Sequence, residues 1–205
     1  MSDQLSTDLE SMVGVWHDRL QAFDLHGEAV AEDPHGGTPG PFPYDNLVYC
    51  DFDGDVWTQS NVTFRGREPT TRTFQADVAD GILRFRRLGP DAPPHIGVSG
   101  GPGLIWFVAE SLHHPGLQQY SEPDLIRLDV SVDPARRWRY TALYRHGPLV
   151  RPMLVEGERL TTDTTKTHEL DPRGADAPVH GEKSTTLQYR DHPQATDQRR
   201  DNDHG

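Results

Sequence analysis

Hydrophobic and polar residues alternate along most of the chain, in short runs separated by turn residues. Before the first of these runs, residues 3–12 follow a helical pattern that places Leu5, Leu9 and Met12 on one side, with Ser6 or Thr7 as the expected N-cap. From Gly14 onward the period changes to two, which is typical of β-strands that bury one face. The pattern predicts about ten strands and one short helix, and therefore an all-β fold.

Turn residues separate the predicted strands in pairs. Asp-Gly at 53–54 and at 80–81 is a strong signal for a tight hairpin, because both central residues of a type I′ turn need a positive φ. The predicted strands after Gly14 occupy residues 15–27, 46–52, 56–64, 70–79, 82–88, 95–100, 104–111, 124–132, 136–147, 149–160 and 183–190. Consecutive hairpins form a meander, and a meander of this length tends to close because closure removes exposed edges. We therefore expect an antiparallel up-and-down barrel of about 8–10 strands.

The stretch Asp51-Phe52-Asp53-Gly54-Asp55 is the strongest local candidate for chemistry. A strand that delivers two aspartates into a loop resembles the nucleophile and general acid of haloacid-dehalogenase-type phosphatases. Such a site needs a helix after the strand, whereas residues 55–64 follow a strand pattern, and the third aspartate would repel a phosphate. The stretch is therefore interpreted as a hairpin turn with solvated carboxylates.

Charge and composition exclude several classes of protein. The 205 residues carry a formal net charge of −12, which argues against nucleic acid and against anionic membranes as partners. The single cysteine, Cys50, excludes an internal disulfide, and no apolar run is long enough to span a membrane. The chain is expected to be soluble and cytoplasmic. It divides into a helical arm (1–12), one barrel domain (13–190) and a disordered polar tail (191–205).

Gly14-Val15-Trp16, at the start of the first predicted strand, matches the Gly-x-Trp signature of lipocalins and other calycins. Residues 14–30 and 136–160 together resemble the uncharacterised lipocalin-like domains allied to phycobiliprotein chromophore lyases, and the resemblance covers roughly residues 8–190. It implies a lipocalin-like barrel in which Arg190, at the end of the last strand, packs over Trp16. Both residues would be structural in this arrangement.

Alternation along residues 137–146 predicts which side chains face the barrel interior. The odd positions include three arginines and are assigned to water, whereas the even positions are mostly aromatic and are assigned to the interior. On the strand at 104–111, an inward Trp106 would bring Glu110 inward as well, with Arg84 or Arg151 as its partner. The predicted ligand-binding residues are Trp106, Glu110, Trp138, Tyr140, Tyr144 and His146.

Three hypotheses for the function follow from this barrel. The first is a binding protein that holds a small, partly hydrophobic or pigment-like ligand. The second is a barrel enzyme, either an isomerase, a cyclase or a lyase, that uses Glu110, Tyr144 or His146 as acid or base. The third is a filled barrel that binds a protein partner. No metal site or cofactor is expected, because the eleven histidines show no ligand spacing, and a homodimer remains open.

Overall fold

The computed structural model describes residues 3–32, 41–65, 68–86, 94–111, 120–121, 123–145 and 148–165. Its one described helix is α1 (Gln4–Met12). The described strands are β1 (Gly14–Ala22), β2 (Tyr44–Phe52), β3 (Val56–Phe64), β4 (Thr70–Ala79), β5 (Ile82–Phe85), β6 (His95–Gly101), β7 (Leu104–Ala109), β8 (Tyr120–Ser121), β9 (Asp124–Asp129), β10 (Arg136–Arg145) and β11 (Leu149–Thr161).

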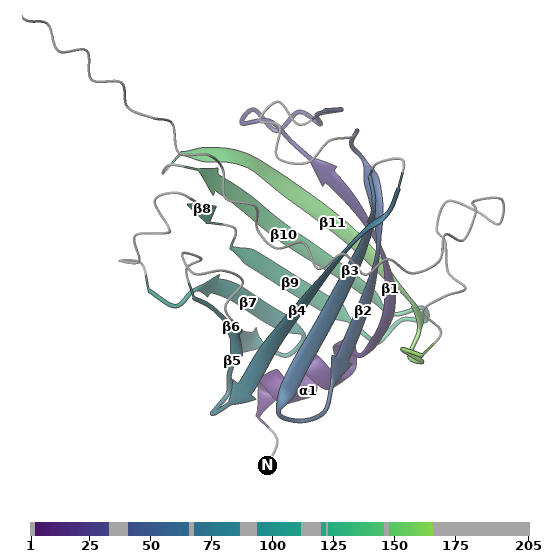
Figure 1. Cartoon of the computed structure of the whole chain (residues 1–205), viewed down its shortest axis with the longest axis vertical. Coiled ribbons are helices and arrows are strands. Elements are labelled where there is room, and N and C mark those ends of the chain that lie inside the picture. Colours follow the sequence, from purple (N-terminus) through teal and green to yellow (C-terminus); the bar gives the residue numbers. More distant parts are fainter. Residues whose placement is uncertain are drawn as a thin grey trace, which may run out of the picture.

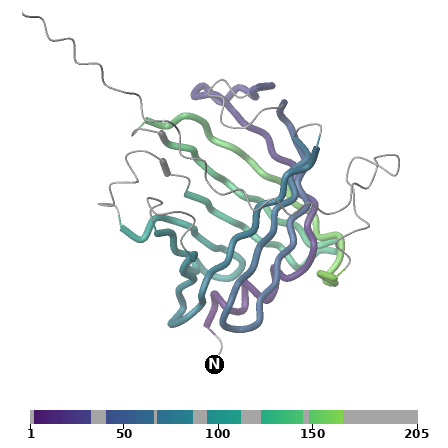
Figure 2. Tube along the Cα trace, in the orientation of Figure 1, coloured from purple at the N-terminus to yellow at the C-terminus, as the bar shows by residue number. Residues whose placement is uncertain are grey.

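Ten of the described strands form a closed antiparallel ring (Figure 1). From β1 to β7 each strand pairs with the next along the chain, and β9 then continues the ring from β7 to β10. β11 pairs with both β10 and β1 and so closes the barrel. The short β8 pairs with the end of β10, outside the ring. The predicted up-and-down barrel with a short N-terminal helix is confirmed, and Figure 2 follows the chain around it.

Turns connect the strands at both Asp-Gly pairs, but at the first pair only Gly54 has a positive φ, at 104°, so the type I′ prediction is wrong for Asp53. Asp80 and Gly81 both have positive φ, at 54° and 72°, as a type I′ turn requires. In the β2–β3 turn, the Asp53 carboxylate accepts hydrogen bonds from the backbone N–H groups of Asp55 and Val56. These bonds hold the pKa of the Asp53 carboxyl below its ordinary value. The acidic stretch is therefore a hairpin turn, as interpreted from the sequence.

Helix α1 closes one end of the barrel (Figure 1). Its buried residues Leu5, Leu9 and Met12 pack with buried side chains of the strands. The N-cap is Asp3, whose side chain accepts from the Ser6 N–H, so the predicted caps at Ser6 or Thr7 are wrong. Both of those residues lie inside the helix, because it begins at Gln4.

The main core lies between this helix and the ring of strands. It contains the buried residues Leu5, Leu9, Met12, Trp16, Val48, Cys50, Trp57, Ala76, Val78, Leu83, Ile105, Phe107, Ile126, Leu128 and Ala135. Helix and strands are also joined by polar contacts: the Trp16 indole donates to the Met12 carbonyl, and the Gly103 N–H donates to the Asp8 carboxylate. The helix is thus an integral end-cap of the barrel.

Several sequence predictions fall outside the described residues. These are the strand at 183–190 with Arg190, the polar tail at 191–205, and His146.

Candidate functional site

The side chains of β10 point the opposite way from the sequence prediction. Arg137, Thr141 and Leu143 are each 3% exposed, whereas Tyr140 is 59% exposed. The odd positions therefore face the interior and the even positions face outward. The prediction was wrong because it counted arginine as a surface residue, without the carboxylates that neighbouring strands place opposite each inward guanidinium.

Arg137 forms a buried, bidentate ion pair with Asp18 of β1. Its Nη2 lies 2.7 Å from Asp18 Oδ2, and its Nε lies 3.0 Å from Asp18 Oδ1. The two side chains are only 4% and 1% exposed. Burial is the largest single influence and disfavours the charged guanidinium, but Asp18 and Cys50 together outweigh it and raise the pKa of Arg137 above its ordinary value. The pair thus forms a buried polar layer that borders the apolar core.

Two further contacts fix this layer. The Arg137 guanidinium lies 4.7 Å from the centre of the Trp16 ring, and its Nη1 is 3.8 Å from the sulfur of Cys50. Burial raises the pKa of the Cys50 thiol to about 11, although Arg137 opposes the shift. Gly157 of β11 lies between Asp18 and Arg137 in the register, and a Cβ there would collide with Asp18 Oδ1 and the Arg137 side chain. The sequence therefore needs glycine at this strand position.

A second arginine packs against Trp16. The Arg159 guanidinium of β11 lies 5.6 Å from the ring centre, and its Nη1 donates to the Ser11 carbonyl at the end of α1. Arg159, on the last described strand of the barrel, therefore covers the tryptophan of the Gly-x-Trp motif. The resemblance placed this role on Arg190; the described arginine in this position is Arg159.

The barrel interior holds a partly open cavity of about 80 Å³, and Arg137 of the Asp18–Arg137 pair is part of its lining. Three phenylalanines of β4, β5 and β7 and Ile126 of β9 form its apolar part, and the Phe85 and Phe107 rings meet edge to face at 5.4 Å. Its polar part combines two amides, one carboxylate and two guanidiniums. The lining residues are Gln59, Asn61, Phe74, Phe85, Phe107, Asp124, Ile126, Arg137 and Arg139.

Arg139 and Asp124 form the ion pair of this cavity. Arg139 Nη2 donates to Asp124 Oδ2 at 2.6 Å, and their side chains are 20% and 14% exposed. On the facing strand β3, the Gln59 and Asn61 amides are joined by a 2.9 Å hydrogen bond. An interior with stacking surface and a few converging polar groups is the usual composition of a small-molecule site.

The residues predicted to bind ligand lie mostly on the outer surface. Trp106 is 44% exposed, and it lies in register with Leu125, which is in turn in register with Tyr140. Trp138 and Tyr144 share the outward side of β10 with Tyr140 and are half-buried. The structure thus brings four of the predicted residues onto one outer face. Their predicted inward direction is wrong, and their role in ligand binding stays a prediction.

Glu110 also lies outside the barrel. Its carboxylate is 3.5 Å from Arg84 Nε, and the two side chains are 44% and 49% exposed. Arg84 was one of the two partners that the sequence suggested for an inward Glu110. The pairing is confirmed, but on the opposite face.

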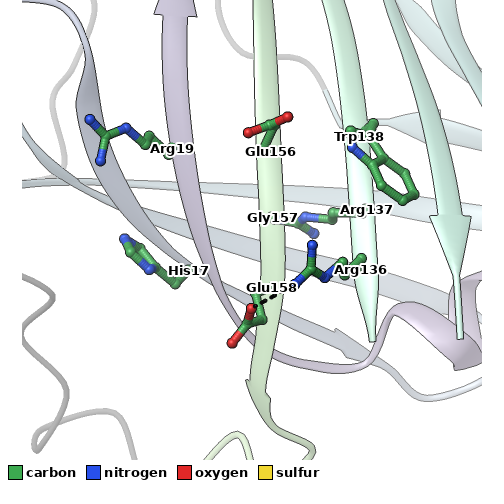
Figure 3. A pocket seen from close by; sticks show the side chains of 8 residues that line it. All are labelled: His17, Arg19, Arg136, Arg137, Trp138, Glu156, Gly157 and Glu158. Carbon is green, nitrogen blue, oxygen red and sulfur yellow. Dashed lines mark ion pairs between the residues drawn. The ribbon is translucent and has the colours of Figure 1, made fainter. Parts of the chain in front are cut away.

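An outer groove of about 240 Å³ lies over β1, β11 and β10 (Figure 3). Charged side chains of both signs surround it, and Glu158 and Arg136 approach to 3.8 Å. The lining residues are His17, Arg19, Arg136, Arg137, Trp138, Glu156, Gly157 and Glu158. The groove has no apolar walls apart from Trp138, so the lumen is the better candidate for a partly hydrophobic ligand.

Sequence reasoning missed the polar groups of the lumen: Asp18, Gln59, Asn61, Asp124, Arg137 and Arg139. One available signal was Gly157, because a glycine inside a strand marks a close approach by another group. Within the described ranges, no three histidine, cysteine, aspartate or glutamate side chains are grouped to hold a metal ion. The same residues contain no helix that is long and apolar enough to cross a membrane.

No protein-family model and no curated protein matches this chain. Solved structures do match. A protein of unknown function from the DUF3598 family of Nostoc punctiforme superposes with a TM-score of 0.52 and 18% identity. The match covers 75% of this chain and 48% of that one, so this chain spans about half the length of the DUF3598 protein.

The second structure is the S-type phycobiliprotein lyase CPES from Guillardia theta. It superposes with a TM-score of 0.53 and 7% identity, over 78% of this chain and 94% of the lyase. At these identities the likeness concerns the fold. The lipocalin-like barrel that Gly-x-Trp and the meander predicted is therefore confirmed: this chain has the barrel fold of a phycobiliprotein lyase and of a DUF3598 protein.

Proposed function

We propose that this protein binds a small, partly aromatic ligand with an acidic group inside the barrel. The observation that carries the proposal is the pairing of three phenylalanines with two guanidiniums around one interior cavity. Phenylalanine rings stack on flat apolar groups, and a guanidinium donates charge-assisted hydrogen bonds to a carboxylate. Such a cavity selects for a ligand with both features.

The size of the cavity bounds what it can hold. At about 80 Å³ it is smaller than the ~300–1,000 Å³ of typical drug-sized sites. It therefore suits one ring or one acidic arm, with the rest of a longer ligand directed away from the end that α1 closes. That one structure of this fold is named a phycobiliprotein lyase supports a pigment-like ligand of this kind.

A retained ligand is the first thing to look for. Native mass spectrometry and an absorption spectrum of gently purified protein should show a bound small molecule. Absence of any bound mass would favour the filled-barrel hypothesis or a weakly held ligand, and titration with a fluorescent aromatic anion separates those two.

The titration uses anilinonaphthalene sulfonate, an aromatic anion whose fluorescence rises on binding. The double variant Asp124→Leu with Arg139→Met removes both charges of the lumen pair without leaving one buried charge uncompensated. We expect its affinity for the probe to fall about 10- to 100-fold, as the loss of a charge-assisted hydrogen bond predicts.

The matched control is Asp77→Leu with Arg86→Met, which removes an equally close pair, 2.7 Å apart, from the exposed surface. This variant should bind the probe as the wild type does. Equal affinity in all three proteins would contradict a lumen anion site. Tyr140→Glu, on the outer face, checks that the probe does not report binding there.

A further inference from the structure

The outside of the barrel carries an apolar row that the lumen site does not explain. Cross-strand register aligns Leu154, Tyr140, Leu125, Trp106 and Val98 across β11, β10, β9, β7 and β6. Tyr140 and Trp106 are 59% and 44% exposed, and the other three side chains are half-buried. These five residues form what is called here the apolar outer face.

The next outward positions along the strands extend this face. Pro152 and Ala142 are in register on β11 and β10, and Val108 and Ile96 are in register on β7 and β6. All four are half-buried. Soluble monomers rarely expose a continuous apolar surface of this kind, and such surfaces usually mark an interaction site.

Among the described residues, the charged side chains that border the apolar outer face are balanced in sign. One side of the face, on β1, β9, β10 and β11, has three arginines and three carboxylates: Arg19, Arg127, Arg136, Asp129, Glu156 and Glu158. On the side of β5 and β7, the Arg84–Glu110 pair is also neutral. This balance contrasts with the net charge of −12 for the whole chain.

We propose that the apolar outer face is the contact between two copies of this chain in a two-fold dimer. An aromatic centre with a polar rim is the usual composition of a protein interface. A neutral rim of mixed charges is complementary to itself, whereas a strongly acidic or basic partner would find no matching charge. Two chains of net charge −12 repel each other in general, and this neutral face is where that repulsion is locally absent.

The closed ring favours side-chain packing as the mode of contact. The ten-stranded ring has no free edge, and among the described strands only the two-residue β8 pairs on one side alone. The ring therefore cannot extend its sheet into a second copy, and association is expected to use the outward side chains. In a two-fold contact each exposed aromatic is buried twice, once in each copy. Tyr140 and Trp106 are therefore expected to dominate the interaction.

Sedimentation equilibrium of the full chain at micromolar concentration tests the proposal. The wild type should have twice the chain mass of 23.0 kDa. Tyr140→Glu and Trp106→Glu should each weaken self-association at least about 30-fold. Leu25→Glu is the matched control, because Leu25 is 64% exposed, lies beyond the end of β1 and is none of the nine residues of this face. The Leu25→Glu variant should remain dimeric.

Chemical cross-linking gives a second test that does not depend on weakening the dimer. Cys50 is fully buried, so Tyr140→Cys introduces the one accessible thiol within the described residues. A flexible bis-maleimide should join two Tyr140→Cys chains and leave Leu25→Cys chains single. A monomeric wild type, a dimer that survives both glutamate variants, or no cross-linking through position 140 would each overturn the proposal.

The proposal of a dimer and the proposal of a lumen site can be contradicted independently of each other. Tyr140→Glu should give a monomer that still binds anilinonaphthalene sulfonate, whereas the Asp124→Leu, Arg139→Met variant should give a dimer that does not.

Discussion

The two faces of β10 reverse the usual distribution of charged and aromatic residues. Its inward side carries Arg137 and Arg139 in ion pairs, and its outward side carries Trp138 and the exposed Tyr140. The inward arginines are tolerated because β1 and β9 place a carboxylate opposite each of them. Hydrophobicity alone therefore does not decide which face of a strand is buried; the charges of the neighbouring strands do.

The largest expected effect comes from breaking the inner ion pair. Arg137→Met leaves the Asp18 carboxylate buried and unpaired, and we expect a loss of about 3–5 kcal/mol in the free energy of unfolding. Urea denaturation followed by tryptophan fluorescence measures it.

The control for Arg137→Met removes both partners. Asp18→Leu with Arg137→Met leaves no uncompensated charge and should recover most of the lost stability. A loss below about 1 kcal/mol for Arg137→Met alone would show that the pair is less buried than its 4% and 1% exposures indicate.

A smaller effect should appear at alkaline pH, through Cys50. Burial raises the thiol pKa of the folded protein from 9.0 to about 11. Between pH 9 and 11 the unfolded thiol loses its proton while the folded one keeps it, so stability falls as the pH rises. The slope is about 1.4 kcal/mol per pH unit and the total about 2–3 kcal/mol.

Cys50→Ala isolates this contribution. The variant is less stable at neutral pH but should lack the additional decline between pH 9 and 11 that the wild type shows. Tyr49, whose pKa burial also raises, is present in both proteins, so the difference between their pH profiles belongs to the thiol. Parallel profiles would contradict a protected Cys50.

Gly157→Ala should act on the same inner layer with a lesser effect. A Cβ at this position meets Asp18 and Arg137, so the pair must shift, at a cost of about 1–3 kcal/mol. Glu158→Ala, next along β11 and about half exposed, is the control and should change little. An unchanged unfolding free energy for Gly157→Ala would mean that the ion pair can move without loss.

Gly157 also marks how far the sequence could predict this molecule. The meander, the positions of the Asp-Gly turns and the Leu5–Leu9–Met12 helix face follow from local patterns, and these predictions are confirmed. The lumen does not follow from such patterns, because Asp18 and Arg137 are 119 residues apart and meet only through the register of β1, β11 and β10. The alternation along a strand separates two faces but does not say which of them points into the barrel. The predicted directions of Tyr140 and Arg137 are therefore the reverse of those in the structure.

The smallest expected effect is at the outer ion pair between Arg84 and Glu110. Both side chains are close to half exposed and 3.5 Å apart, so water and salt screen their attraction. A double-mutant cycle with Arg84→Met and Glu110→Gln should give a coupling energy below about 1 kcal/mol that declines further at high salt. The same cycle on Asp18 and Arg137 should give a larger coupling that salt hardly changes, because the solvent does not reach that pair. Equal salt dependence in the two cycles would mean that solvent reaches the inner pair as it reaches the outer one. It would contradict the conclusion that the two faces of the barrel wall differ in solvation.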